Sequence, residues 1–260
     1  MKVSLITVCY RSAGTIMSAF DSVLSQKGVE IEYIVVDGGS DDGTVDIIRE
    51  YAQRIPQLEL QSSITFRWIS ERDAGMYDAI NKGIKMATGD IVGILNADDR
   101  LADENVLATV VASFESQVDC IYGDIRFVRG ESLKTVRYYS SRPWRRWMHY
   151  WGYMPAHPSV YVRKEVFERY GLYELGYDIS GDFEWMVRIL CRKRIEARYL
   201  PHCLVTMRLG GKSTAGFKAM WKLNIENVRA NRRNGYFCVL PMMLPKYLFK
   251  VLGYVFKKRS

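Results

Sequence analysis

The chain has 260 residues, of which 48% are hydrophobic and 25% charged, a composition typical of a folded globular protein with one or two domains. Its five cysteines are scattered and never spaced as Cys-x-x-Cys, which argues against a zinc site or a disulfide framework. The pattern predicts that the protein resides in a reducing compartment, the cytoplasm. The net charge of +8 is uneven, because residues 186–260 carry 17 lysines and arginines against two acids, whereas residues 1–185 carry 20 basic and 27 acidic residues.

This basic end of the chain predicts contact with an anionic partner such as nucleic acid, lipid or a polyphosphate, and a merely solvated basic face is the alternative. The first ten residues, MKVSLITVCY, contain an apolar stretch too short for the core of a signal peptide. We therefore expect a protein that is not exported.

Short apolar runs alternate with amphipathic stretches in the first half of the chain, a pattern typical of βαβ units around a parallel sheet. Strands are predicted at 3–9, 31–36, 64–70 and 90–95, and helices at 15–25, 44–51 and 76–86. In the second half the pattern is looser, and it predicts strands at 120–128 and 157–163 and helices at 181–192 and 214–233.

The last stretch, 236–260, is rich in apolar residues but is interrupted by prolines and lysines. It lacks the run of about 20 apolar residues that a transmembrane helix needs. Residues 244–255 place apolar side chains on one helical face beside several lysines, which predicts a helix lying on anionic lipid. A helix docked on its own domain is the alternative.

Two of the predicted strands end in acids, at the sheet edge where parallel α/β proteins bind ligands. The first is Asp37, followed by the loop GGSDDGT. A carboxylate there suits a neutral partner with donors, such as a base N–H or a ribose hydroxyl. A GxGxxG fingerprint is absent, which disfavours a nicotinamide site. Asp41 and Asp42 are better explained as a turn into the next helix.

The second acidic strand end is Asp98 beside Asp99, after the apolar run 91–95. Two neighbouring carboxylates in a cleft oppose each other's ionisation unless a cation lies between them and a further anion. Mg²⁺ or Mn²⁺, held by one or two carboxylates together with substrate phosphates, would satisfy this requirement.

Several segments occur together in an order and spacing that resemble family 2 glycosyltransferases of the GT-A fold, especially members that assemble bacterial polysaccharides. They are SLITVCYRSAGTI, YIVVDGGSDDGT, SERDAGMYDAINKGI, GDIVGILNADD and SGDFEW. The resemblance implies an α/β fold with a mixed, mostly parallel central sheet flanked by helices. It also implies a catalytic domain over residues 1–215, with a nucleotide-binding half at 1–117 and an acceptor half at 118–215, followed by basic amphipathic helices at 216–260.

The resemblance further implies an inverting transfer of sugar from a nucleoside diphosphate sugar, usually linked to UDP. On that basis Asp37 binds the base, and the metal motif Asp-x-Asp falls on Asn96-Ala97-Asp98, so that Asp98 becomes the ligand of Mn²⁺ or Mg²⁺. Asn96 replaces the first acid of that motif and contributes no charge. The remaining residues expected at the nucleotide are Thr7, Tyr10, Asp73 and Lys82, although Lys82 is equally explained as a solvated lysine.

The catalytic base of the family matches Asp182, which would take the proton of the attacking acceptor hydroxyl. Glu184 is the second candidate, although helical geometry turns it away from Asp182. Contacts with the diphosphate or the acceptor are expected from Arg208, Lys212, Ser213 and His157, and a structural role is the alternative for His157. The GGKST segment is not a P-loop, because Thr206 stands where the first glycine would be.

We therefore expect a metal-dependent glycosyltransferase that is peripheral to the inner face of the cell membrane and uses a glycan or lipid-linked saccharide as acceptor. Two other classes were considered, a sugar-phosphate nucleotidyltransferase and a non-catalytic nucleic-acid binder that uses the basic tail. A nucleotidyltransferase would need an N-terminal glycine-rich nucleotide loop, which this chain lacks. A nucleic-acid binder conflicts with the acidic first half of the chain. No nucleic-acid partner and no particular oligomeric state are predicted.

Overall fold

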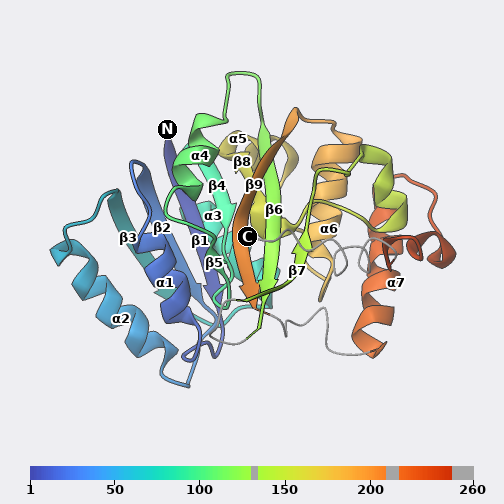
Figure 1. Ribbon diagram of the computed structural model, residues 1–260. Helices are drawn as coiled ribbons and strands as arrows, with labels where there is room; N and C mark the ends of the chain where they lie inside the picture. The colour runs from blue at the N-terminus through green and yellow to red at the C-terminus, as the bar shows by residue number, and fades with distance from the viewer. Residues whose placement is uncertain (130–133, 209–216, 248–260) are drawn as a thin grey trace.

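The computed structural model describes residues 1–129, 134–208 and 217–247, and within them nine strands form one sheet with helices on both faces (Figure 1). The strands are β1 Lys2–Cys9, β2 Glu30–Asp37, β3 Ser63–Ser70, β4 Ile91–Ile94, β5 Arg100–Leu101, β6 Cys120–Val128, β7 Thr135–Tyr139, β8 Val160–Arg163 and β9 Ala197–Arg208. The α-helices are α1 Ile16–Leu24, α2 Thr44–Arg54, α3 Met76–Met86, α4 Val106–Ala112, α5 Lys164–Tyr170, α6 Gly181–Met186 and α7 Phe217–Arg233.

The sheet is mixed, with the strand order β3-β2-β1-β4-β8-β6-β9-β5, and β7 pairs with β6. Strands β3, β2, β1 and β4 run parallel to one another, whereas β8 is antiparallel to both β4 and β6. The expected α/β fold with a mostly parallel sheet is thus confirmed.

Alternating side chains of the parallel strands build a separate core on each face of the sheet. On one face Ile6 and Ile34 pack with residues of α3 and α6, and on the other Leu5 and Tyr33 pack with residues of α1 and α4. Because both faces are covered, these strands read in the sequence as continuous apolar runs, which is why they are predicted well.

The predicted strands and helices of the first half are confirmed to within a few residues, but two predictions in the second half are only partly right. Residues His157–Ser159 form a 3₁₀ turn before β8, since Pro158 has no N–H to donate to a strand neighbour. The helix predicted at 181–192 is α-helical only to Met186 and continues as a π-helix over Val187–Arg192.

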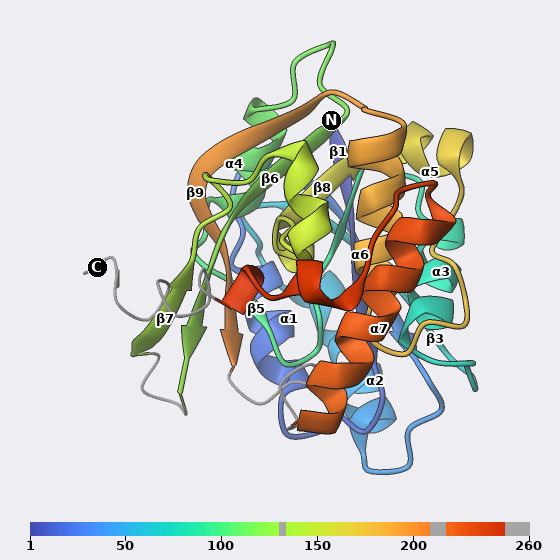
Figure 2. The same cartoon turned by 90° about the vertical axis from the view of Figure 1, so that its right-hand side faces the viewer.

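The last long helix, α7, packs against α6 and belongs to the same body (Figure 2). The buried carboxylate of Glu226 accepts hydrogen bonds from the main-chain N–H groups of Asp178, Ile179 and Ser180, at 2.9–3.2 Å. In the described parts of the chain, no helix is both long and apolar enough to cross a membrane.

Glu32, in the middle of β2, is a buried carboxylate that ties together three neighbouring segments. It accepts hydrogen bonds from Ser4 on β1 at 2.6 Å, from Arg67 on β3 at 2.9 Å, and from the N–H and hydroxyl of Thr88 at 2.7 and 2.9 Å. Burial alone would raise the pKa of Glu32, but these hydrogen bonds outweigh it and lower the pKa to about 2.

We predict that Glu32→Gln destabilises the protein by roughly 3 kcal/mol near neutral pH, because a carboxylate with a folded pKa of about 2 and an ordinary value of 4.5 favours folding above that value. This contribution should disappear as the pH falls from about 4.5 towards 2. Urea unfolding of both proteins at several pH values measures it, with Glu30→Gln, an exposed glutamate of the same strand, as the control. A difference that stays constant with pH would contradict the prediction.

Candidate active site at the carboxyl edge of the sheet

The parallel register brings the ends of β1, β2 and β4 to one edge of the sheet. Cys9 lies opposite Asp37, and the main-chain N–H of Leu95 donates to Ile6 at 2.9 Å just after β4. The loops that follow these strands therefore converge, and the acids that the sequence places at strand ends share one site.

Asp37 is fully buried, and the groups that surround its carboxylate belong to the protein itself. Oδ2 accepts from the N–H groups of Gly39 and Ser40 at 3.0 and 2.9 Å and from the hydroxyl of Ser70 at 2.7 Å, and Oδ1 accepts from the Ser40 hydroxyl at 2.5 Å. Burial opposes ionisation, yet these hydrogen bonds lower the pKa of Asp37. The carboxylate therefore shapes the loop after β2.

Asp41 and Asp42 join this loop to the loop after β1. Asp41 forms an exposed ion pair with Arg11 at 2.7 Å, and Asp42 accepts from the N–H groups of Ala13 and Thr44, both at 3.1 Å. These contacts agree with the interpretation of the two acids as a turn into α2.

Asp73 lies beside this loop, and its carboxylate accepts fewer hydrogen bonds than that of Asp37. Oδ1 accepts from the N–H of Gly75 at 2.8 Å, whereas Oδ2 has no hydrogen bond within the described residues. A Cβ atom on residue 38 would lie 2.5 Å from this Oδ2 and 3.4 Å from the ring of Tyr10, so a side chain there would displace the Asp73 carboxylate. Tyr10 is 58% exposed. Gly38, Asp73 and Tyr10 thus surround one open position.

Thr7 and Lys82 make contacts within the protein. Thr7 is fully buried, with its hydroxyl 3.0 Å from that of Tyr33 in the core. The Lys82 ammonium donates to the main-chain oxygen of Arg72 at 2.9 Å and pairs with Glu71 at 2.9 Å, which holds the turn that carries Asp73.

The segment after β4 presents two carboxylates in different environments. Asp98 is half-buried, whereas Asp99 is 1% exposed and accepts from the Asn96 amide at 2.9 Å through Oδ2. Its other oxygen, Oδ1, is buried and has no partner among the described residues. Burial, followed by the charge of Asp98, raises the pKa of Asp99 well above its usual value. Ala97 between them is buried.

The sequence pattern predicts a cation at the adjacent pair Asp98 and Asp99 and names Asp98 as the ligand. The environment of Asp99, with its buried and unpartnered Oδ1, makes it a further candidate. Among the described residues, no group of three or more His, Cys, Asp or Glu side chains is placed to hold a metal ion.

Arg208, at the end of β9, is brought to the same place by the pairing of β9 with β5, in which Thr206 lies opposite Arg100. Its main chain lies near the carboxylate of Asp99 and partly opposes the rise in the pKa of that group. Lys212 and Ser213 lie outside the described residues.

Asp182 is half-buried in the first turn of α6, and Tyr77 lies against it. The Tyr77 hydroxyl lies 3.2 Å from Asp182 Oδ1 and donates to the main-chain oxygen of Ile179 at 2.6 Å. A Cβ atom on residue 181 would lie 2.7 Å from the Tyr77 ring, which explains the glycine before Asp182. No pattern in the sequence pairs Tyr77 with Asp182, because 105 residues separate them.

Glu184 and His157 are both buried. Glu184 pairs with Arg188 at 2.9 Å and accepts from the Asn234 amide at 3.1 Å, and so it faces away from the open site. His157 Nε2 lies 2.8 Å from the hydroxyl of Tyr173, and burial lowers the pKa of this imidazole, although the charge of Asp182 acts in the opposite direction.

Comparisons with known proteins agree with this arrangement. The family described as Glycosyl transferase family 2 matches residues 4–171. The PGL/p-HBAD biosynthesis glycosyltransferase Rv2957 of Mycobacterium tuberculosis is 28% identical over 206 residues, which cover 76% of this chain and 73% of the relative.

Two solved structures share the fold at low sequence identity. TarS 1–349 of S. aureus in complex with UDP-GlcNAc has a TM-score of 0.62 at 17% identity, covering 89% of this chain and 68% of TarS 1–349. The match to a longer TarS chain covers 40% of it. The mannosyltransferase PcManGT of Pyrobaculum calidifontis, in complex with GDP-Man and Mn²⁺, has a TM-score of 0.62 at 18% identity, covering 99% of this chain and 76% of the neighbour. The chain belongs to glycosyl transferase family 2 and is a glycosyltransferase of the GT-A fold that acts on nucleotide sugars.

Proposed function

We propose that this glycosyltransferase moves one sugar, with inversion, from a UDP-sugar to a glycan or lipid-linked saccharide during cell-surface polysaccharide synthesis. The observation that carries the proposal is the parallel register, which brings the loops that carry Asp73 and the Asp98–Asp99 pair to one edge of the sheet, while Tyr77 at the start of α3 contacts Asp182. The mycobacterial relative is named for the biosynthesis of PGL/p-HBAD, and TarS binds UDP-GlcNAc, which supports a UDP-linked donor. We place the reaction in the cytoplasm at the inner face of the membrane.

Within this proposal, the nucleoside lies against Tyr10 and Asp73. The free Oδ2 of Asp73 can accept a hydrogen bond from a base N–H, and the exposed ring of Tyr10 provides a surface for stacking. Asp37, whose oxygens accept from Gly39, Ser40 and Ser70, contributes by fixing the loop beneath the base. Thr7 contributes indirectly, by packing against Tyr33 in the core, and Lys82 contributes by holding the 71–73 turn.

The residues after β4 fit a divalent cation. The buried Asp99 Oδ1 has no partner among the described groups, Asp98 lies beside it, and these carboxylates together with the Asn96 amide are hard oxygen donors that suit Mn²⁺ or Mg²⁺. When bound, the cation would stabilise negative charge on the departing diphosphate. Arg208 adds a positive charge beside it, and Lys212 and Ser213 are proposed to approach the same phosphates.

Asp182 is proposed as the catalytic base. A carboxylate at the open end of α6 can take the proton of the acceptor hydroxyl, and the nearby Tyr77 hydroxyl restricts the orientation of Oδ1. His157 remains neutral and contributes from beneath the acceptor or donor sugar, through its contact with Tyr173. No observation favours nucleotidyl transfer or nucleic-acid binding over sugar transfer.

The first prediction concerns the base. Asp182→Asn should lower the transfer rate by about 10²- to 10⁴-fold, the usual contribution of general base catalysis, while the affinity for UDP stays within about twofold. Release of UDP from UDP-sugars, with water as the acceptor, measures the rate, and calorimetry measures UDP binding. Tyr77→Phe should give a smaller loss of rate. An Asp182→Asn variant that no longer binds UDP would refute the assignment.

The second prediction separates Asp73 from Asp37. Asp73→Asn should weaken UDP binding by about tenfold or more, since a hydrogen bond to a charged acceptor is lost, without lowering the melting temperature. Gly38→Ala should act in the same direction by displacing Asp73 Oδ2. Asp41→Asn, which breaks only an exposed ion pair, is the control. Asp37→Asn should instead lower the melting temperature. If Asp37→Asn weakened UDP binding at an unchanged melting temperature, Asp37 rather than Asp73 would be the residue that contacts the nucleotide base.

The third prediction concerns the cation. Mn²⁺ should increase the thermal stabilisation of the protein by UDP, and EDTA should reverse this effect, because the metal joins carboxylates to diphosphate. Asp98→Ala should abolish the Mn²⁺ dependence, whereas Asp103→Ala, which removes a nearby acid that pairs with His202, should preserve it. Equal stabilisation by UDP in Mn²⁺ and in EDTA would argue against a metal at this site.

A further inference from the structure

Helix α7 exposes a regular stripe of cationic and apolar side chains to solvent. Its exposed residues recur every three or four positions along the helix and therefore share one face. They are Lys218, Trp221, Lys222, Ile225, Arg229, Arg232 and Arg233. Trp221 and Ile225 are 51% and 46% exposed. Three acids border this face: Glu226 is buried, and Asp178 and Glu174 pair with Lys222 and Arg233.

The buried face of α7 is largely polar, unlike that of an ordinary amphipathic helix. Besides Val228 and Ala230 it buries Glu226, Asn227 and Asn231, and Asn234 is buried just beyond the helix end. Glu226 binds the turn before α6, and Asn234 binds Glu184. Because polar partners already anchor α7, its exposed apolar residues are not needed to hold the helix in place.

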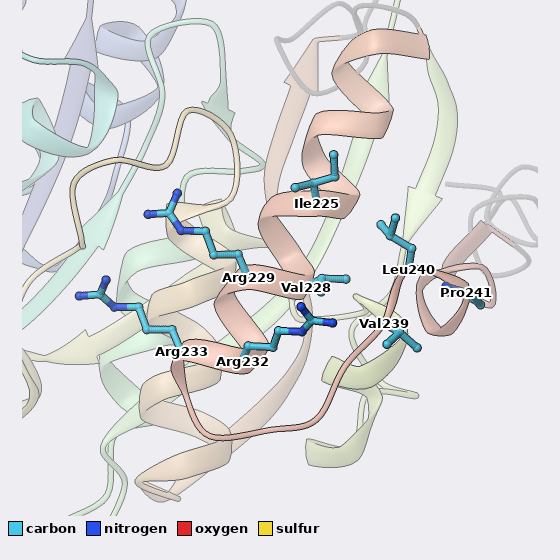
Figure 3. Close-up of a pocket in the computed structure, with 8 residues that line it drawn as sticks. All are labelled: Ile225, Val228, Arg229, Arg232, Arg233, Val239, Leu240 and Pro241. Atoms are coloured by element: carbon cyan, nitrogen blue, oxygen red, sulfur yellow. The ribbon is translucent and has the colours of Figure 1, made fainter.

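An open apolar groove of about 760 Å³ runs between α7 and the segment that follows it (Figure 3). Ile225 and Val228 lie on the α7 side of the groove, and Val239 and Leu240 lie opposite. The guanidinium of Arg232 points into the space between these two sides. A second hollow continues along α7 past Ile225 to Trp221.

The arginines of this face are held in position by groups of the protein. Arg232 Nε donates to the main-chain oxygen of Cys238 at 2.9 Å, and its terminal nitrogens make no hydrogen bond within the described residues. Arg229 lies 4.5 Å from the centre of the Tyr177 ring, and Arg233 pairs with Glu174 at 2.8 Å. Each guanidinium has five N–H donors, so donors remain for an external anion.

We propose that this face of α7, together with residues 239–241, docks on a bilayer that contains anionic phospholipid. Lys218, Arg229 and Arg232 would contact lipid phosphates, while Trp221 and Ile225 enter the interfacial region between them. A nucleic acid would use the cations but would leave this apolar groove exposed to water. The inference rests on the proposed location at the membrane, and it moves the contact from the predicted helix at 244–255, most of which lies outside the described residues, to α7.

This placement also links the membrane to the catalytic centre. Glu226 is buried at the flank of the exposed face, where it lines the second hollow with Ile225 and Arg229, and it holds the main chain of residues 178–180, shortly before Asp182. A helix docked on the bilayer would therefore carry the base with it, at a fixed distance from the membrane surface. Such an arrangement suits an acceptor that is itself anchored in lipid.

Co-sedimentation of the full chain with vesicles tests the proposal. The wild type should bind vesicles of equal parts phosphatidylcholine and phosphatidylglycerol, and should bind pure phosphatidylcholine at least about tenfold less, with binding weakened by salt. Trp221→Glu and Lys218→Glu should each lower binding to the anionic vesicles by about tenfold. The matched controls are Met17→Glu, another half-exposed apolar side chain, and Lys85→Glu, another exposed lysine, and both should bind like the wild type.

Two further measurements, of UDP release and of the melting temperature, distinguish a loss of docking from a loss of activity or of stability. UDP release from UDP-sugars without vesicles should be unchanged in Trp221→Glu, so a failure of the proposed sugar transfer is seen separately from a failure of docking. A lower melting temperature in Trp221→Glu would indicate that another part of this chain covers the face, and would overturn the proposal. Equal binding of α7 and control variants, or binding of the wild type to duplex DNA in preference to anionic vesicles, would also overturn it.

Discussion

The hydrogen bonds that Asp37 accepts at the end of β2 determine the shape of the loop at the proposed donor site. A buried carboxylate needs donors, and here they come from the next loop and from the neighbouring strand, through Gly39, Ser40 and Ser70. The loop is thereby drawn back over the strand end. This in turn places Gly38 against Asp73, where a side chain on residue 38 would push the carboxylate aside.

Buried carboxylates serve the same purpose elsewhere in the molecule. Glu32 joins β1, β3 and the segment after α3, and Glu226 joins α7 to the turn before Asp182. In each case the charge is stabilised by several N–H or O–H donors, so the cost of burial is offset and an irregular segment is fixed. Asp99 differs, because one of its oxygens has no partner among the described residues. That difference sets a candidate ligand site apart from structural carboxylates.

The sequence predicts the strand ends well but not the surroundings of the side chains there. Continuous apolar runs locate β1, β2 and β4, and with them the positions of Asp37 and Asp98. Burial and hydrogen-bond partners depend on contacts between segments far apart in the chain. The core position of Thr7 beside Tyr33 and the pairing of Tyr77 with Asp182 are of this kind. Strand β9 is not predicted, because its polar and apolar residues alternate only weakly and its partner strands β6 and β5 are distant in the sequence.

Helix α7 shows why the pattern of the basic tail is difficult to interpret. Hydrophobic periodicity assumes that apolar residues face inward, yet this helix buries Glu226 and Asn231 and exposes Trp221 and Ile225. Asn231 donates to the main-chain oxygen of His149, so the inner face is held by specific polar contacts. A helix built in this way can keep apolar and cationic groups on its outer face without losing its own anchorage. Part of the positive charge in the second half of the chain thus lies on the exposed face of α7, beside Glu226, which holds the turn before the proposed base.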